Sequence, residues 1–254
     1  MPGPSSFTTT KGVAGFTNSQ TSGSYSTLWG DCPILDYITD PSIGVYFYDD
    51  FLSYHTTSLW TSTLTNIGTS AITTGLGGWL AINASDGSVA DNDEAYVYGT
   101  SAAFQIQAGK DLWYECELMF TETNTDDNNI IAGLSSIGTA DFLLDNGGGP
   151  AANFDGLCFY KLDGGTTYNA AASQAANQTL LTALATRVAG TPVRLGIRTY
   201  SNNLATFFLN GAQITSTGTY LPTAAMRPVF GAKNGDITNV ETLSVNWVRC
   251  FQIR

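Results

Sequence analysis

The chain has 254 residues, of which 43% are hydrophobic and 12% aromatic, so it can bury the core of one large domain and is not a disordered chain. Only 12% of the residues are charged, and the net charge of −11 excludes nucleic acid and anionic membranes as main partners, because both would repel the protein. The first residues lack a basic region followed by an apolar run, and no apolar run approaches the ~20 residues that span a bilayer. We therefore expect synthesis in a cytoplasm.

Residues 1–44 form the first distinct segment. They are rich in Ser, Thr, Gly and Pro, and they contain single apolar residues but no apolar run of strand length before Ile34. Two interpretations remain open, a floppy terminus or an extended arm that becomes ordered against neighbouring subunits. Spaced aromatic residues favour the arm, because a pure linker would not need them. Its predicted contact residues are Phe7, Phe16, Tyr25, Leu28 and Trp29.

Residues 45–254 form the second segment, in which short runs of branched and aromatic residues are bounded by Gly, Asn, Asp or Pro, as is typical of strands. The predicted strand regions are 45–54, 58–74, 77–83, 95–107, 112–121, 130–138, 156–165, 191–200, 204–214, 227–233 and 243–254. Residues 168–188 fit a helix or a strand with a loop equally well, and residues 141–155 predict a glycine-rich loop that is mobile unless a neighbour holds it. So many short strands predict an all-β fold, a two-sheet antiparallel jelly-roll sandwich.

Two strands show which faces enter the core, because side chains alternate across a strand. For residues 112–121 the predicted core face is Leu112, Tyr114, Cys116, Leu118 and Phe120, and the opposite face is Trp113, Glu115, Glu117 and Met119. For the closing strand, one predicted face is Leu243, Val245, Trp247, Phe251 and Ile253, and the other carries Val248 and Cys250. The four cysteines, Cys32, Cys116, Cys158 and Cys250, form no metal-binding pattern, and buried free thiols are favoured over disulfides.

Two segments carry a family resemblance. They are the hairpin motif Phe207–Gly211 (FFLNG) and the closing strand Val245–Gln252 (VNWVRCFQ). With the order of the other strands, they make residues 45–254 resemble the concanavalin A-like (laminin G-like) jelly roll of lectins, endoglucanases and many phage virion proteins. The resemblance implies the fold but not one function, because this fold hosts hydrolases, sugar-binding proteins and structural modules.

The resemblance also predicts where catalytic residues would lie. Retaining endoglucanases of this fold carry alternating acids on one strand of the concave face, with two carboxylates about 5 Å apart. The equivalent window here, Asp141–Asp163, contains no Glu and no closely alternating acids. Glu115 and Glu117 do alternate, but in the resemblance they lie on an earlier framework strand. We therefore predict no catalytic residues and no enzymatic activity.

Metal sites are weakly indicated. The loops Asp91–Glu94 and Asp126–Asn129 offer the oxygen ligands that calcium prefers, but neither matches a defined calcium loop, and solvated turns explain them better. His55 is the only histidine, so a zinc site is not expected and a surface or packing role is favoured. We predict no metal and no cofactor, with structural calcium as the alternative.

These features lead to a functional hypothesis. A jelly roll without hydrolytic acids, with an adhesive N-terminal arm and few charges, suggests a non-catalytic tailed-phage virion protein, a capsid decoration (cement) protein. It would be made in the host cytoplasm and located on the capsid surface, where its sandwich and arm bind the major capsid protein lattice. The resemblance implies a homo-oligomer, often a trimer. The alternative is a glycan-binding module of a tail fibre or surface protein using Trp113, Glu115 and Glu117, and a laminarinase-like endoglucanase ranks third.

Overall fold

A computed structural model describes residues 27–75, 77–85, 90, 92–122, 128–145, 147–235 and 241–254. The elements are η1 (Thr27–Trp29), α3 (Ile34–Thr39), η2 (Pro41–Ile43), β1 (Gly44–Asp49), β2 (Trp60–Thr65), β3 (Thr69–Thr73), β4 (Trp79–Asn83), β5 (Glu94–Gly99), β6 (Leu112–Thr121), β7 (Asn128–Ser135), β8 (Gly156–Lys161), β9 (Thr167–Gln174), β10 (Asn177–Thr186), β11 (Val193–Tyr200), β12 (Leu204–Leu209), β13 (Ala212–Thr217), β14 (Arg227–Asn234) and β15 (Thr242–Ile253). Over these residues, no helix is long and apolar enough to cross a membrane.

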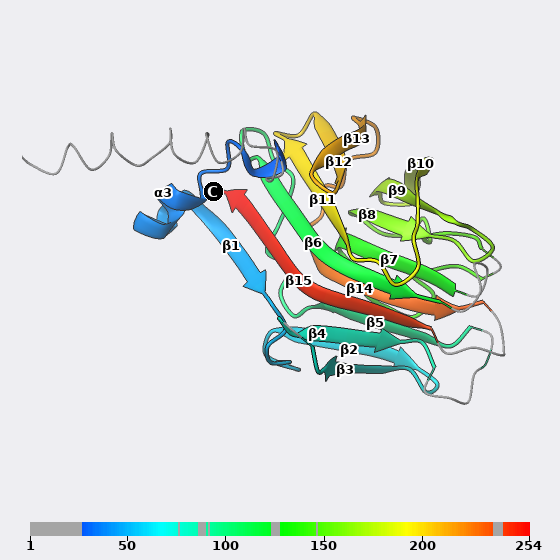
Figure 1. Ribbon diagram of the computed structural model, residues 1–254. Coiled ribbons are helices and arrows are strands. Elements are labelled where there is room, and N and C mark those ends of the chain that lie inside the picture. The colour runs from blue at the N-terminus through cyan, green and yellow to red at the C-terminus, as the bar shows by residue number, and fades with distance from the viewer. Residues whose placement is uncertain are drawn as a thin grey trace, which may run out of the picture.

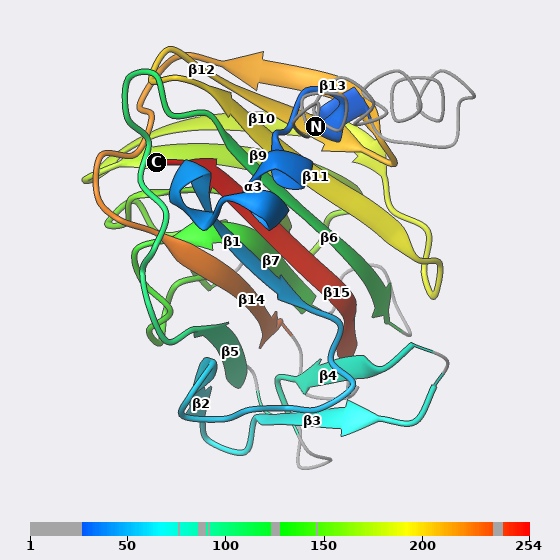
Figure 2. The same cartoon turned by 90° about the vertical axis from the view of Figure 1, so that its left-hand side faces the viewer.

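The strands form two antiparallel sheets packed face to face, which confirms the predicted all-β jelly-roll sandwich (Figure 1). Sheet A has the order β13-β12-β11-β6-β15-β4-β3. Strand β1 pairs with the second half of β15, beside the stretch that pairs with β4 (Figure 2). Sheet B has the order β10-β9-β8-β7-β14-β5-β2. The main core lies between the two sheets.

The two central strands of sheet A test the predicted faces. Every residue predicted for the core face of β6 lies in the main core. In β15 the pairing with β6 shifts between Val245 and Trp247, which leaves Asn246 as an extra residue, a β-bulge. Beyond the bulge the faces exchange, so Val248 and Cys250 enter the core. The predicted grouping of Leu243 and Val245 with Trp247, Phe251 and Ile253 on one face was therefore wrong, because the last three turn to the outer face.

Two further predictions are resolved by the fold. Residues 168–188 form the hairpin β9–β10 and not a helix, with Ala175 and Ala176 at positive φ in the turn. All four cysteines are free, as expected, and three of them are buried in strands of the two sheets: Cys116, Cys158 and Cys250. The fourth, Cys32, is half-buried next to α3.

Candidate functional site

Part of the outer face of sheet A is covered by the chain's own residues 28–43. Leu28 is fully buried and Trp29 is 8% exposed, and both pack on an outer cluster of Trp113, Phe208 and Phe251. Leu28 fits closely because β11 carries Gly196 beneath it, where an added Cβ would lie 2.5 Å from the Leu28 Cδ2 atom. The covering segment is thus packed against the sandwich upstream of the boundary predicted at residue 45.

A buried carboxylate fastens this segment to the sheet. The Trp29 indole N–H donates a hydrogen bond to Glu115 Oε2 at 2.8 Å, and the Arg249 guanidinium donates to the same oxygen at 2.6 and 3.2 Å. Arg249 also lies 4.1 Å from the ring centre of Trp29, which is a cation–π distance. Glu115 is 1% exposed, so its charge is balanced inside the protein.

A second ion pair lies next to the first. Arg198 donates to both Asp31 oxygens at 2.6 Å and to Asp111 at 3.2 Å. Its guanidinium lies 5.0 Å from the ring centre of Trp113 and 4.0 Å from that of Tyr200. Burial would lower the pKa of Arg198, but the hydrogen bonds that it donates to Asp31 and Asp111, together with the Asp31 charge, outweigh burial and raise the pKa. The segment is therefore held by two arginine side chains of sheet A, Arg198 and Arg249, whose planar guanidinium groups can each make two parallel hydrogen bonds.

These contacts decide where the predicted site residues lie. Of the predicted glycan-binding residues, Trp113 and Glu115 are buried beneath the segment, and Glu117 is half-buried. Burial raises the pKa of Glu117, the Arg194 charge opposes that rise, and the Glu115 charge adds to it. The predicted arm residues Leu28 and Trp29 contact their own sheet and do not lie at the surface. Three other predicted arm residues fall outside the described residues: Phe7, Phe16 and Tyr25.

The outer face of sheet B is also covered, by the loop between β7 and β8. This loop, residues 136–155, places Phe142, Leu143 and Phe154 in a second apolar cluster on the sheet. The sheet residues in that cluster are Tyr96, Ile131, Cys158, Tyr160, Ala171 and Val229. The predicted glycine-rich loop is thus held by its own sheet and needs no neighbouring molecule, with Asn146 outside the described residues.

Polar contacts fix the same loop. Lys233 of β14 lies 2.6 Å from Asp145, 3.1 Å from Asp141 and 3.7 Å from Glu94. Burial would lower the pKa of Lys233, but these carboxylates raise it overall. The Tyr96 hydroxyl donates to Glu94 at 3.0 Å and accepts the loop N–H of Leu143 at 2.9 Å. Sheet B therefore holds the loop with an ion-pair cluster beside the aromatic contacts.

The strand on which the resemblance would place catalytic acids carries none. The outer face of β8 presents Cys158 and Tyr160, both buried under the loop. The Glu115 and Glu117 pair lies on sheet A and not on β8. Glu115 is 1% exposed and lies 2.6 Å from Arg249, so it is not a free carboxylate on an open face.

The predicted calcium loops are only partly described. Asp93 is used inside the protein, because it accepts hydrogen bonds from Asn66 at 2.6 Å and Ser85 at 2.7 Å. Asn128 and Asn129 belong to β7, and Asn129 accepts the N–H of Asp163 at 2.8 Å. No cluster of three or more His, Cys, Asp or Glu side chains that could hold a metal occurs among the residues that the structure covers. Three other predicted ligands lie outside them: Asp91, Asp126 and Asp127.

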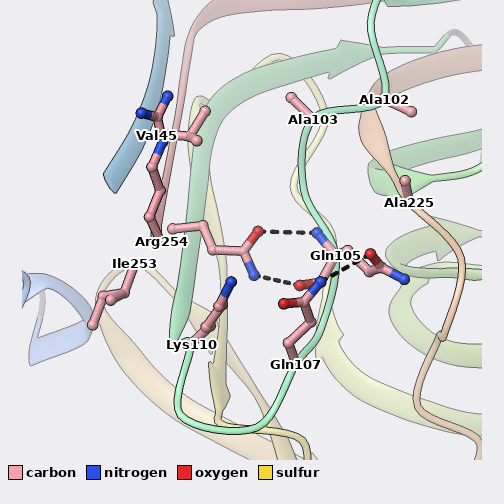
Figure 3. Close-up of a pocket in the computed structure, with 10 residues that line it drawn as sticks. Val45, Ala102, Ala103, Gln105, Gln107, Lys110, Ala225, Ile253 and Arg254 are labelled. Atoms are coloured by element: carbon pink, nitrogen blue, oxygen red, sulfur yellow. Dashed lines mark hydrogen bonds between the residues drawn. The ribbon is translucent and has the colours of Figure 1, made fainter. Parts of the chain in front are cut away.

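Two openings remain beside β1, at the edge of the sandwich. The first has a volume of about 230 Å³ and lies between the chain end and the loop 102–110 (Figure 3). The Gln252 side chain accepts the N–H of Gln105 at 2.9 Å and donates to its carbonyl, which fixes one wall. The pocket is lined by Val45, Ala102, Ala103, Gln105, Gln107, Lys110, Ala225, Gln252, Ile253 and Arg254. Its lining thus contains two cations and no acidic side chain.

The second opening has a volume of about 140 Å³ and shares Val45 and Ala103 with the first, so both lie along the same strand. Sequence reasoning missed both openings. Their residues are spread from position 45 to position 254, and no local motif marks them. The one usable signal was the pair of cations, Lys110 and Arg254, in a chain with few basic residues.

Comparisons with known proteins identify the fold. No protein-family model and no curated protein sequence matches the chain. Solved structures do match: the carbohydrate recognition domain of Emp47p (TM-score 0.59, 14% identity, 84% of this chain and 98% of that one) and Bacillus licheniformis β-glucanase (TM-score 0.57, 13% identity, 81% and 97%). Peanut lectin is similar to the same degree (TM-score 0.56, 11% identity, 82% and 97%). The chain therefore shares the jelly-roll fold of lectins and glucanases. Because the sequence identities are low, the likeness extends to the fold alone.

Proposed function

We propose that this chain is a non-catalytic structural protein, a capsid decoration protein of a tailed phage, whose sandwich serves as a rigid body on the head shell. The observation that supports this most is that the chain's own segments cover much of the outer face of sheet B and part of the outer face of sheet A. The covered parts of these faces hold aromatic side chains and ion pairs and have little room left for a polysaccharide. The remaining surface suits contact with other proteins.

The environment of the Glu115 carboxylate supports a non-catalytic role. Glycoside hydrolysis needs one ionised and one protonated carboxyl group on opposite sides of the scissile bond. Glu115 is buried and paired with Arg249. The Trp29 indole donates a hydrogen bond to the same carboxylate and stands between it and an approaching sugar. A sugar would reach it only after residues 28–31 left the sheet, and that step would break the Trp29 hydrogen bond to Glu115 and separate Asp31 from Arg198.

In this proposal the partner is the major capsid protein lattice of the head shell, and residues 1–26 are the segment that contacts it. These residues contain Lys11 and no Asp or Glu, so their charge is +1 while the rest of the chain carries −12 (−11 − 1). A polar, nearly uncharged segment can lie against a repeated protein lattice without the repulsion that an acidic body would meet. Many weak contacts of this kind add up on a lattice. The protein would be made in the host cytoplasm and located on the capsid surface.

The test is the position of the polypeptide in intact particles. Cryo-electron microscopy and mass spectrometry of purified particles of the encoding phage should place it on the head shell. Particles made with a chain lacking residues 1–26 should carry clearly less of it, although the truncated protein remains folded. The proposal fails if the protein is absent from particles or if truncation leaves shell occupancy unchanged.

Glycan binding is the second candidate, and the pocket between β1 and the loop 102–110 favours it. Gln107, Lys110 and Arg254 line a space of about 230 Å³ and can donate hydrogen bonds to hydroxyl or carboxylate groups of one sugar unit. A glycan array with the purified protein tests it, and binding that is lost in Lys110→Ala would rank this function first.

A further inference from the structure

A buried group of charged side chains has no part in the proposed function. Lys161, the last residue of β8, is fully buried. Its ammonium group donates to Glu122 Oε2 at 2.8 Å and to the backbone carbonyl of Asn128 at 2.9 Å. Arg187 pairs with the other oxygen of the same carboxylate and is also buried. Two cations therefore share the Glu122 carboxylate inside the protein, and burying charges is costly unless they are balanced.

These surroundings prepare the Lys161 amine to act as a nucleophile. The Nζ atom lies 5.7 Å from the ring centre of Phe120, so an aromatic ring and not water borders that side of the amine. Burial lowers the pKa of Lys161, and the hydrogen bond and charge of Glu122 oppose that effect only in part. A desolvated lysine beside a carboxylate can pass it a proton and become the neutral amine, which is the form that attacks a carbonyl carbon.

The carbonyl carbon within reach is that of the Asn128 side-chain amide. Lys161 lies opposite Ile130 in the β7–β8 ladder, and Asn128 lies two residues along β7, so the three side chains share the inner face. Nζ contacts the Asn128 backbone carbonyl, and the amide carbon Cγ is two bonds from the same Cα, so rotation of the lysine side chain brings Nζ to Cγ. Asn128 is fully buried, and its Oδ1 atom has no hydrogen-bond partner in the part of the chain that the structure describes. Its amide nitrogen donates to Asn234 at 3.1 Å, which holds the group in place.

We propose that Lys161 and Asn128 form an amide bond within the chain, with Glu122 as the proton carrier. The Nζ–Cγ bond forms and the Cγ–Nδ2 bond breaks. The lysine ammonium gives up two protons, which Glu122 accepts in turn and delivers to the departing nitrogen, so an ammonium ion leaves and the carboxylate is regenerated. The reaction consumes no co-reactant. Its product replaces a buried ammonium group by a neutral amide and leaves Glu122 and Arg187 as a one-to-one ion pair.

The bond has a structural consequence for sheet B. It joins the first residue of β7 to the last residue of β8, and the covering loop, residues 136–155, runs between these two strands. The cross-link therefore ties together the two ends of the segment that carries this cover. A covalent link between distant residues restricts the unfolded chain and so stabilises the folded one. The inference does not depend on the proposed function, because the bond forms within one chain whatever that chain binds.

Peptide mass spectrometry of the purified full-length protein tests the bond directly. Trypsin cleaves after Lys and Arg, so a chain without the bond releases residues 111–161 and 162–187 as separate peptides. An amide on Lys161 blocks that cleavage, and we expect one peptide, residues 111–187, lighter than its sequence mass by one ammonia, about 17 Da. After further cleavage by chymotrypsin, the fragments that carry Asn128 and Lys161 should remain joined. Release of residues 111–161 at their sequence mass would overturn the inference.

Two substitutions separate the chemistry from the packing. Glu122→Gln keeps the shape and an acceptor for Lys161 but cannot carry a proton, so trypsin should release both peptides at their sequence masses. Asn129→Ala is the matched control, because Asn129 faces the opposite side of β7, where it accepts the Asp163 N–H, and its loss should leave the cross-link intact. A cross-link that persists in Glu122→Gln, or disappears in a folded Asn129→Ala, would contradict the assignment. The wild-type peptide masses decide the inference even where a variant fails to fold.

Discussion

The strongest consequence of the fold is that residues 28–43 belong to the folded domain, and Trp29→Ala tests it. Trp29 is 8% exposed and packs on Trp113 and Phe251. Its indole N–H donates to the buried Glu115 carboxylate, and its ring contacts the Arg249 guanidinium. The substitution removes an apolar contact, a hydrogen bond to a charged group and a cation–π contact at one position.

The expected loss can be worked from these contacts. Replacing a buried Trp by Ala costs about 3–5 kcal/mol in protein cores, and a site at the outer face should fall near the lower end, about 3 kcal/mol. For a domain of this size, 1 kcal/mol lowers the melting temperature by roughly 2–4 °C, so we expect a decrease of about 6–12 °C. Trp29→Phe keeps most of the apolar contact and loses the hydrogen bond to Glu115. It should therefore cost about 1.5 kcal/mol.

Urea unfolding followed by circular dichroism, together with thermal melts, measures both variants. Trp247→Ala is the matched control, because Trp247 lies on the same face, is only half-buried and contacts Arg249 at a longer 5.5 Å. It should lose less than about 1 kcal/mol. If Trp29→Ala unfolds like the wild type, residues 28–43 do not stabilise the domain and are a detachable arm.

Four further outcomes follow from the same structure. A chain without residues 1–26 should melt like the full chain, whereas removal of residues 1–40 should uncover the outer face of sheet A and cause aggregation, as scattering during a thermal melt would report. Neither the wild type nor Glu115→Gln should release reducing sugars from β-glucans, and wild-type turnover that the substitution abolishes would show an enzyme. Burial raises the pKa of Cys116 to about 12, so its thiol should not react with a disulfide reagent at pH 8 until urea is added. Burial alone would raise the pKa of Asp155, but hydrogen bonds from three backbone N–H groups lower it overall. The contribution of Asp155 to stability is therefore present above about pH 4 and is lost as pH falls through the lowered pKa. Asp155→Asn should make the melting temperature fall less steeply with pH in this acid range.

The fold was predictable because strand signals are local. Alternation in residues 112–121 placed all five inward residues of β6 correctly, and the resemblance of the closing strand gave the jelly roll. The prediction failed in β15 where one extra residue, Asn246, shifts the register. A bulge depends on neighbouring parts of the chain, and here the Asn246 side-chain amide donates a hydrogen bond to the Gly78 carbonyl at 2.7 Å. The alternation of apolar residues along one strand cannot predict such a contact.

The candidate site was less predictable because it depends on distant contacts. Trp113, Glu115 and Glu117 were placed on the correct side of β6, away from the core. The sequence could not show that Trp29, 86 residues earlier, and Arg249, 134 residues later, would meet at Glu115. An alternating acid on a strand looks the same whether it faces solvent or a covering segment. Only the tertiary structure separates these cases.

The two covers are built in the same way, and their chemistry argues that they are permanent parts of the protein. Each combines buried aromatic side chains with a sheet cation whose carboxylate partner is partly exposed: Asp31 with Arg198, and Asp145 with Lys233. Exposed ion pairs are screened by salt and contribute little, so they orient a segment more than they hold it. The aromatic contacts contribute more, since burying one side chain such as Phe142 is worth about 1.5–3 kcal/mol and is insensitive to salt. A lid that opens for a ligand would need the reverse balance, with weak apolar contacts and a strong switchable charge. Both covers are therefore held by contacts that persist.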